Sequence, residues 1–357
     1  MLLIISHHYV VNSGLTSLDG PIFSNPLAIK SIFLLIFGAW GKIGINCFLL
    51  ITGYFMCKSK ITAHKFFKLL FEVLFYKIII YFIFLISGYE SFSWVGLAKA
   101  FLPITAIEQN FVGCFLVFYL FIPFINVLVH NLNKKQHFYL LLLIFFVFVI
   151  LGTIPKIYII FNYVTWFVCI YLIGSFLGLY PNKYTESTKL WGLFSVLMLV
   201  LTISSVFVLQ WAYVKYEIGS WSYLVSDSNR ILAVFTAISW FLFFKNLKIK
   251  QSRIINLLGG ATFGVLLIHA NSDTMRTWLW KDLLHNVEVY DNGNLIFLHA
   301  FCAVLGIFIV CLIIEIIRQF LIEKPFMNLF DKIWGRISIW YLSKEQKCFK
   351  DDTIPKE

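Results

Sequence analysis

The sequence has few charged residues for its length, and this scarcity excludes an ordinary soluble domain. Only 13% of its 357 residues are charged, whereas 60% are hydrophobic and 19% are aromatic. Soluble domains carry roughly 25% charged and about 45–50% apolar residues. The composition, with apolar runs of helical length, therefore predicts an all-α, polytopic membrane protein.

Several signatures of catalysis and binding are also missing. The seven cysteines form no C-x-x-C pair, so neither a disulfide framework nor a metal site is indicated. The sequence has no phosphate-binding glycine loop, no zinc-helix histidine motif and no serine-hydrolase elbow. The net charge of +11 would suggest nucleic acid in a soluble protein, but basic residues gather in the cytoplasmic loops of membrane proteins. We therefore expect no metal, no bound cofactor and no nucleic-acid partner.

Apolar runs divide the chain into ten candidate membrane segments. A bilayer core needs about 20 apolar residues per helix. The second segment contains Gly38, Gly41 and Gly44, which predict two pieces with a kink between them. The ten segments are residues 2–12, 31–57, 69–87, 111–130, 138–154, 161–180, 190–210, 230–244, 255–270 and 295–317.

The loops between these segments differ in positive charge. With a cytoplasmic N-terminus, the inside loops contain 20 Lys and Arg residues and the outside loops contain 6. Cytoplasmic loops carry such an excess, so we predict ten helices with both termini in the cytoplasm. Residues 1–326 would form the membrane domain, and residues 327–357 a polar cytoplasmic tail.

Two adjacent histidines, His7 and His8, interrupt the first apolar segment. Ionisable residues within a membrane are costly, which makes the pair a functional hypothesis by default, with a structural hydrogen bond as the alternative. At 1.5 Å per residue, the eleven or so residues before Asn12 cannot cross about 30 Å of hydrocarbon. Either the helix is half-buried or the chain lacks its first residues, and we expect the second.

Further candidates lie on the second and third segments. Asn46 and Gly53 are two turns apart and share a helix face, which suits either a functional site or a tight helix crossing. Lys65 and Lys68 are three residues apart, so their ammonium groups can converge on an anion. On the residues alone, ordinary positive-inside topology is the favoured explanation of the same lysines. Glu72 follows Lys68 by four residues and is placed to pair with it.

His269 ends the ninth segment, and Asp273 follows it by four residues. If the helix continues, the carboxylate can orient the imidazole for acid–base chemistry. A histidine that caps a helix end explains the same spacing. On these observations alone, a transporter for lipid-linked sugars fits as well as an enzyme. A transporter is expected to show internal repeats, and the sequence has no clear repeat.

Four degenerate stretches occur in order over residues 1–326. Together they resemble the membrane-bound acyltransferase type 3 family, which includes bacterial O-acetyltransferases of surface polysaccharides. The stretches are SHHYVVNSG, GKIGINCFLLITGYF, HKFFKLL with FVGCFLVFYLFIPF, and ATFGVLLIH with a later EKP.

The resemblance implies a multi-pass enzyme of the bacterial cytoplasmic membrane, surrounded by lipid. It implies acyl-CoA, usually acetyl-CoA, as a donor substrate that approaches from the cytoplasm. The acceptor would be a hydroxyl of a cell-surface or capsular polysaccharide or of a lipid-linked glycan. The family's essential histidine is followed by an aromatic residue, which corresponds to His8 before Tyr9, with His7 as the second choice.

The resemblance also assigns supporting residues. Lys65 and Lys68 stand where the family has an Arg-x-x-Arg pair associated with CoA phosphates. Thr52 and Tyr54 flank the glycine of the family's glycine-tyrosine signature, with Thr52 in place of serine. The family's basic residue eleven positions before the histidine would precede Met1.

The mechanism implied by the family is acyl transfer. His8 would act as a general base, and a covalent acyl-histidine remains open. Asn46 or backbone groups at the kink would stabilise the oxyanion.

Overall fold

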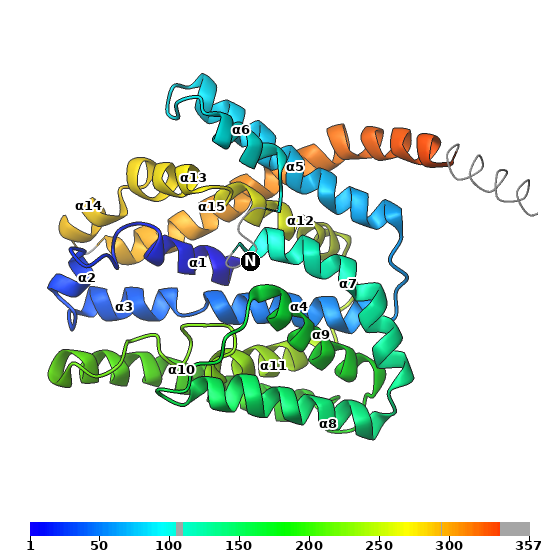
Figure 1. The fold of residues 1–357 in the computed structure, drawn as a ribbon. Helices are drawn as coiled ribbons and strands as arrows, with labels where there is room; N and C mark the ends of the chain where they lie inside the picture. Colours follow the sequence, from blue (N-terminus) through cyan, green and yellow to red (C-terminus); the bar gives the residue numbers. More distant parts are fainter. Residues whose placement is uncertain (105–109, 294, 336–357) are drawn as a thin grey trace, which may run out of the picture.

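A computed structural model describes residues 1–104, 110–293 and 295–335, and this part of the chain is helical without any strand. Figure 1 shows long helices packed side by side, with the short helices α2 and α14 together at one end. The helices are α1 (Leu2–Val11), α2 (Pro21–Ser24), α3 (Ile29–Gly38), α4 (Gly41–Met56), α5 (Ala63–Ile86), α6 (Trp94–Phe101), α7 (Phe111–Asn131), α8 (Lys134–Ile144), α9 (Tyr163–Leu179), α10 (Thr188–Tyr216), α11 (Ile231–Asn246), α12 (Arg253–His269), α13 (Asp273–Thr277), α14 (Asn286–Asp291) and α15 (Ile296–Arg318). Three π-helical segments continue helices, namely η1 (Phe145–Leu151), η2 (Trp278–Leu283) and η3 (Gln319–Glu323).

Every predicted apolar segment coincides with a helix, which confirms the all-α fold. In the described residues, six helices are long and apolar enough to cross a membrane, and they mark a multi-pass membrane protein. Those six are Ile29–Met56, Ala63–Ile86, Phe111–Asn131, Lys134–Leu151, Thr188–Tyr216 and Ile296–Gly335. The helix α12 forms a bent pair with residues 273–291 at 92°, and α1, α9 and α11 are apolar but shorter. Ten crossings with both ends in the cytoplasm stay a prediction.

The second predicted segment consists of two helices, as its glycines suggested. The break between α3 and α4 falls at Ala39 and Trp40, and Figure 1 shows the two helices following one another nearly in line. A side chain at Gly41 would overlap the imidazole ring of His7. The absence of a side chain at Gly41 therefore lets α1 approach α4 closely at the level of the histidines.

The helices α4 and α9 meet through glycines. A Cβ atom at Gly53 would lie 2.5 Å from the carbonyl oxygen of Tyr171, and one at Gly174 would lie 2.6 Å from that of Leu50. Such distances leave no room for a side chain. The face shared by Asn46 and Gly53 is thus a tight helix crossing, one of the two alternatives that the sequence allowed.

Several helices begin at a polar residue whose side chain accepts a hydrogen bond from a backbone N–H of the first turn. These caps satisfy donors that would otherwise have no partner at the helix end. They are Thr62, Asn110, Asn133, Asn162, Ser187 and Ser252.

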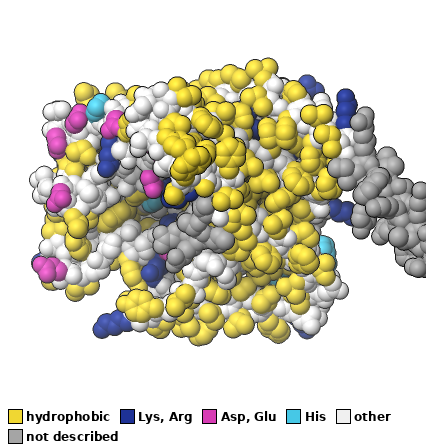
Figure 2. Space-filling view, turned by 45° about the horizontal axis from the view of Figure 1, so that its top comes forward, with side chains coloured by type: hydrophobic (Ala, Val, Ile, Leu, Met, Phe, Trp, Pro, Cys, Tyr) yellow, Lys and Arg dark blue, Asp and Glu magenta, His cyan; other side chains and the backbone are white. Residues whose placement is uncertain are grey.

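The outer surface agrees with a membrane environment. Figure 2 shows hydrophobic side chains over most of the visible face, with acidic side chains gathered toward the end that holds α2 and α14. The helix that contains α15 and η3 continues to Gly335. The predicted boundary between residues 326 and 327 falls within this helix, and the division into a membrane domain and a tail stays a prediction.

Candidate active site

The imidazole rings of His8, on α1, and His269, at the end of α12, contact each other. Nδ1 of His8 lies 3.1 Å from Nε2 of His269, although 261 residues separate them in the sequence. His269 is only 1% exposed, and His8 is half-buried. The first and ninth predicted segments are thus joined by a pair of histidines in the interior.

The hydrogen bonds of His269 define the proton positions in this pair. Nδ1 of His269 lies 2.6 Å from the carbonyl oxygen of Val265, which can only accept a hydrogen bond, so Nδ1 carries the proton. In the neutral ring Nε2 of His269 is then the acceptor, and Nδ1 of His8 donates to it. The second nitrogen of His8, Nε2, is left with its lone pair, as a general base requires.

The neighbouring histidine is held differently. Nδ1 of His7 donates to the carbonyl oxygen of Gly38 at 2.6 Å, across the break between α3 and α4. Its ring packs on the Cα of Gly41, where no side chain could be accommodated. His7 therefore fills the helix break, and its Nε2 also keeps a lone pair in the neutral state.

Both histidines line a cavity of about 680 Å³ between α1, α4, α5, α6, α7, α9 and the turn after α12. This volume lies within the range of small-molecule sites, about 300–1,000 Å³. Basic side chains contribute to its wall, namely those of Lys42, Lys77, Lys99 and Arg276. The cavity therefore combines two imidazoles that can accept a proton with cations that stabilise negative charge.

Lys42 lies in the first turn of α4, directly after Gly41. Its ammonium group donates to the hydroxyl of Tyr163 and lies 3.7 Å from the carboxylate of Asp227. The side chain is 20% exposed. Sequence reasoning assigned no role to this lysine, because its partners come from α9 and from the loop before α11.

The condition under which Asp273 could orient His269, a helix that continues past His269, is not met. The helix α12 ends at His269, and Asp273 begins the separate helix α13. The Asp273 side chain is 96% exposed and accepts a hydrogen bond from Arg276 at 2.9 Å. Because the helix does not continue, the spacing of four residues no longer places the two side chains on one face. The carbonyl oxygen of Val265 instead accepts the hydrogen bond from Nδ1 of His269.

Comparison with known families identifies the scaffold around these histidines. A family model described as an acyltransferase domain matches residues 1–316. The chain belongs to the acyltransferase 3 family. No curated protein and no solved structure matches it. Membership confirms the family that the sequence motifs resembled, and it makes the protein a membrane acyltransferase.

In this acyltransferase, Asn46 connects three helices or loops. Its Nδ2 donates to the carbonyl oxygen of Ser228 at 2.7 Å, and its Oδ1 accepts from Nε1 of Trp166 at 3.0 Å. The residue is fully buried. Both ends of its amide are therefore engaged with the protein, which favours a packing role over stabilisation of an oxyanion.

Thr52 and Tyr54 lie near the other end of α4. The hydroxyl of Thr52 donates to the carbonyl oxygen of Phe48, one turn earlier. The Tyr54 ring lies below the ammonium groups of Lys58 and Lys245, at 5.6 and 5.7 Å from its centroid. At 1.5 Å per residue, these positions are about 17–20 Å along the helix from Gly41 and the histidines.

Lys65 and Lys68 each have a separate partner in this acyltransferase. Nζ of Lys65 donates to the backbone oxygen of Lys60 at 2.9 Å. Nζ of Lys68 lies 2.9 Å from the carboxylate of Glu323. Its ion-pair partner is therefore Glu323 and not Glu72, which the spacing of four residues had suggested. Both lysines remain partly exposed at the start of α5, where a ligand can reach them.

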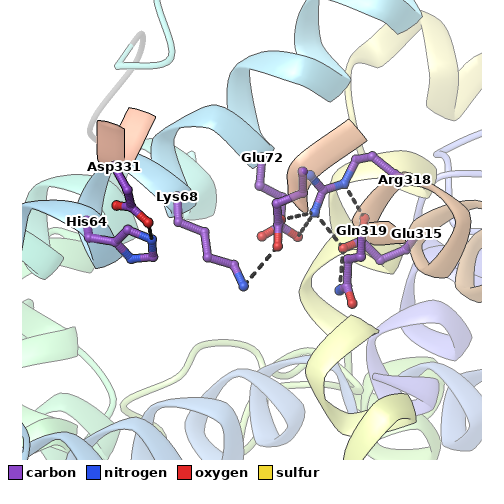
Figure 3. Close-up of polar contacts among 8 residues, drawn as sticks. His64, Lys68, Glu72, Glu315, Arg318, Gln319 and Asp331 are labelled. Atoms are coloured by element: carbon purple, nitrogen blue, oxygen red, sulfur yellow. Dashed lines mark hydrogen bonds and ion pairs between the residues drawn. The ribbon is translucent and has the colours of Figure 1, made fainter. Parts of the chain in front are cut away.

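Glu72 belongs to a buried cluster of charges that joins α5 to α15 and η3 (Figure 3). Arg318 lies at its centre, with Nε and Nη2 each 2.8 Å from the carboxylate of Glu315. Nη2 also donates to Glu323 at 2.6 Å and lies 3.9 Å from Glu72. Tyr76 donates to Glu315 at 2.6 Å. The cluster thus connects the predicted donor-binding Lys68, through Glu323, to the interior of the protein.

The sequence contained a signal for part of this cluster. Glu315 and Arg318 are three residues apart on one helix, a spacing that allows an ion pair. Their contacts with Glu72 and Tyr76 depend on how α5 packs on α15, which no local spacing reveals. Within the described residues, no group of three or more His, Cys, Asp or Glu side chains is placed to hold a metal ion.

Proposed function

We propose that this acyltransferase moves an acyl group, in particular an acetyl group, from acyl-CoA to a hydroxyl of a cell-surface or capsular polysaccharide. The observation that carries the proposal is His8, which lines the cavity and whose Nε2 keeps its lone pair while its Nδ1 donates to His269. This is the arrangement of a general base with an orienting partner.

The reaction uses groups that line the cavity. Nε2 of His8 takes the proton of the acceptor hydroxyl as its oxygen attacks the thioester carbonyl carbon. The new C–O bond forms, the C–S bond breaks, and the thiolate of CoA recovers the proton from the imidazolium. Lys42, which lines the same wall, supplies positive charge for the oxyanion of the tetrahedral intermediate.

The proposed topology has ten membrane helices and both termini in the cytoplasm of a bacterial cell. It is supported by the loop charges, 20 against 6, and by a helix at each of the ten segments. Lys65 and Lys68 then face the cytoplasmic pool of acyl-CoA and bind its phosphates as point charges. The acceptor reaches the cavity from the opposite side, either as a polysaccharide or as a lipid-linked glycan.

The test uses membranes that contain the full chain, labelled acetyl-CoA and the host's surface polysaccharide. Wild-type membranes should transfer label to polysaccharide, and His8→Ala should reduce the transfer by about 10²–10⁴-fold at an unchanged protein level. His7→Ala is the matched comparison, because it removes the neighbouring imidazole, whose ring fills the helix break and is not the proposed base. If His8→Ala transfers acetyl as the wild type does, His8 is not the base; if the wild type transfers none, the proposed function is wrong.

The acceptor is identified by a comparison of glycans. Surface polysaccharide from a deletion strain should lack the O-acetyl signals that NMR detects in the parent strain. Complementation with the wild-type chain should restore these signals, whereas complementation with His8→Ala should not. Identical spectra for parent and deletion strains would contradict a polysaccharide acceptor.

A further inference from the structure

Two lysines meet on the cavity wall that also contains His8. Lys77 comes from α5 and Lys99 from α6, and Nζ of Lys77 lies 3.4 Å from the backbone oxygen of Lys99. Lys77 lies within a long apolar helix and is half-buried. An ionisable residue at such a position normally faces a water-filled cavity or an opposite charge, and it marks a functional site by default.

Within residues 1–104, 110–293 and 295–335, neither lysine has a carboxylate within ion-pair distance. Two acidic residues line the same cavity, but both have other partners. Glu90 accepts a hydrogen bond from Thr274 at 3.0 Å, and Asp273 pairs with Arg276 at 2.9 Å. Glu108 lies outside the described residues.

Like charges that face one cavity repel each other, and an anion between them removes this cost. The two ammonium groups therefore favour a negatively charged ligand. A lysine binds carboxylate and phosphate groups alike, because it acts as a compact point charge.

The position of the lysines favours the acceptor over the donor. Lys99 and Arg276 lie in the stretches 88–110 and 271–294 between predicted membrane segments, which the charge count places outside the cell. The predicted outside loops together carry only 6 of the 29 Lys and Arg residues. Two of these six, Lys99 and Arg276, line the cavity. Acyl-CoA is a cytoplasmic compound and is expected at the opposite end, near Lys65 and Lys68.

We propose that Lys77 and Lys99 form an anion subsite beside His8 that binds a carboxylate or phosphate group of the acceptor glycan. The acceptor is then an acidic sugar polymer or a glycan linked to a lipid through phosphate. The inference rests on the proposed acyl transfer and adds the chemical class of the acceptor to it.

The first test measures binding and does not depend on turnover. Purified full-length protein in nanodiscs is titrated with a glucuronic-acid oligosaccharide, with its carboxyl-reduced form and with a diphosphate-linked lipid sugar. We expect wild type to prefer an anionic probe over the neutral one by at least about tenfold, and Lys77→Gln/Lys99→Gln to lose this preference. Lys77→Arg/Lys99→Arg should keep it, and Lys156→Gln, at an exposed loop lysine, is the matched control.

The two anionic probes distinguish the sources of the negative charge. Preference for the acidic oligosaccharide indicates a polymer acceptor, and preference for the diphosphate-linked sugar indicates a lipid-linked one. Equal binding of anionic and neutral probes by the wild type overturns the subsite. Wild-type binding by Lys77→Gln/Lys99→Gln, with the protein monodisperse, overturns it as well.

The second test separates acceptor from donor. In the acetyl-transfer assay, Lys77→Gln/Lys99→Gln should raise the acceptor KM by about tenfold or more and leave the KM for acetyl-CoA unchanged. A rise in the KM for acetyl-CoA alone would assign the lysines to the phosphates of the donor and overturn the inference. Absence of transfer by the wild type contradicts the proposed function, and the binding measurements still decide the subsite.

Discussion

His8 donates a hydrogen bond from Nδ1 to Nε2 of His269, and Nδ1 of His269 donates one to the backbone oxygen of Val265. One helix end thereby selects the tautomer of an imidazole on a different helix. A hydrogen bond at one ring nitrogen fixes the lone pair on the other, which a histidine that acts as a general base requires.

Replacing His269 by Phe should lower kcat because His8 loses the acceptor that orients it. A well-placed general base contributes about 10²–10⁴-fold, so we expect kcat to fall at least about tenfold while the KM for acetyl-CoA stays nearly constant. His269→Gln offers an amide oxygen to the same proton and should recover part of the rate. Steady-state kinetics on purified protein measure both values, and a wild-type kcat for His269→Phe would contradict the orienting role.

The double substitution Lys65→Ala/Lys68→Ala should weaken the use of acetyl-CoA. Loss of charge-assisted contacts with phosphate should raise the KM for the donor by about tenfold or more. Lys60→Ala removes an exposed charge from the same loop and is the matched control. An unchanged donor KM in the double variant would mean that these lysines do not bind the donor and only follow the positive-inside rule.

Arg318→Met should destabilise the protein strongly. It leaves the buried carboxylate of Glu315 without its counter-charge and leaves Glu323 with Lys68 alone, and removal of one partner from a buried pair costs about 3–5 kcal/mol. Thermal unfolding in detergent should show a clearly lower Tm. Lys324→Met, at an exposed position next to the cluster, should unfold like the wild type, and equal Tm values for both variants would contradict the role of Arg318.

Gly53→Ala and Gly174→Ala should each separate α4 from α9. The added Cβ would lie 2.5–2.6 Å from a backbone oxygen of the facing helix, and overpacking costs about 1–3 kcal/mol or more when the backbone must move. Gly306→Ala is the matched control, because a Cβ atom there has no neighbour within 4 Å among the described residues. Its Tm should equal or exceed that of the wild type, since alanine favours helix. Wild-type Tm values for the first two variants would rule out a tight crossing.

Much of the fold was predictable from the sequence because hydropathy and chain length limit what a membrane chain can form. The apolar runs located a helix at each of ten segments, and the glycines near Gly41 located the break between α3 and α4. The family was predictable too, since short motifs in a constant order carry it. These features depend on residues that are close together in the sequence.

The candidate site was predictable only in its parts. The sequence indicated His7, His8 and His269 separately, but paired His269 with Asp273 on the assumption of a continuous helix. It likewise placed Glu72 beside Lys68, whereas Glu323 holds that lysine. Local spacing predicts a contact only while the helix continues and no closer partner arrives from elsewhere.

The amino-acid sequence by itself therefore determined that two histidines lie in an apolar segment of a multi-pass membrane acyltransferase, because composition, hydropathy and motif order are properties of the chain. Only the tertiary structure decided that His8 faces His269 and that its lone pair is at Nε2. The physical reason is distance along the chain. A partner 261 residues away is selected by the packing of whole helices, and packing is a collective property that no single stretch of sequence contains.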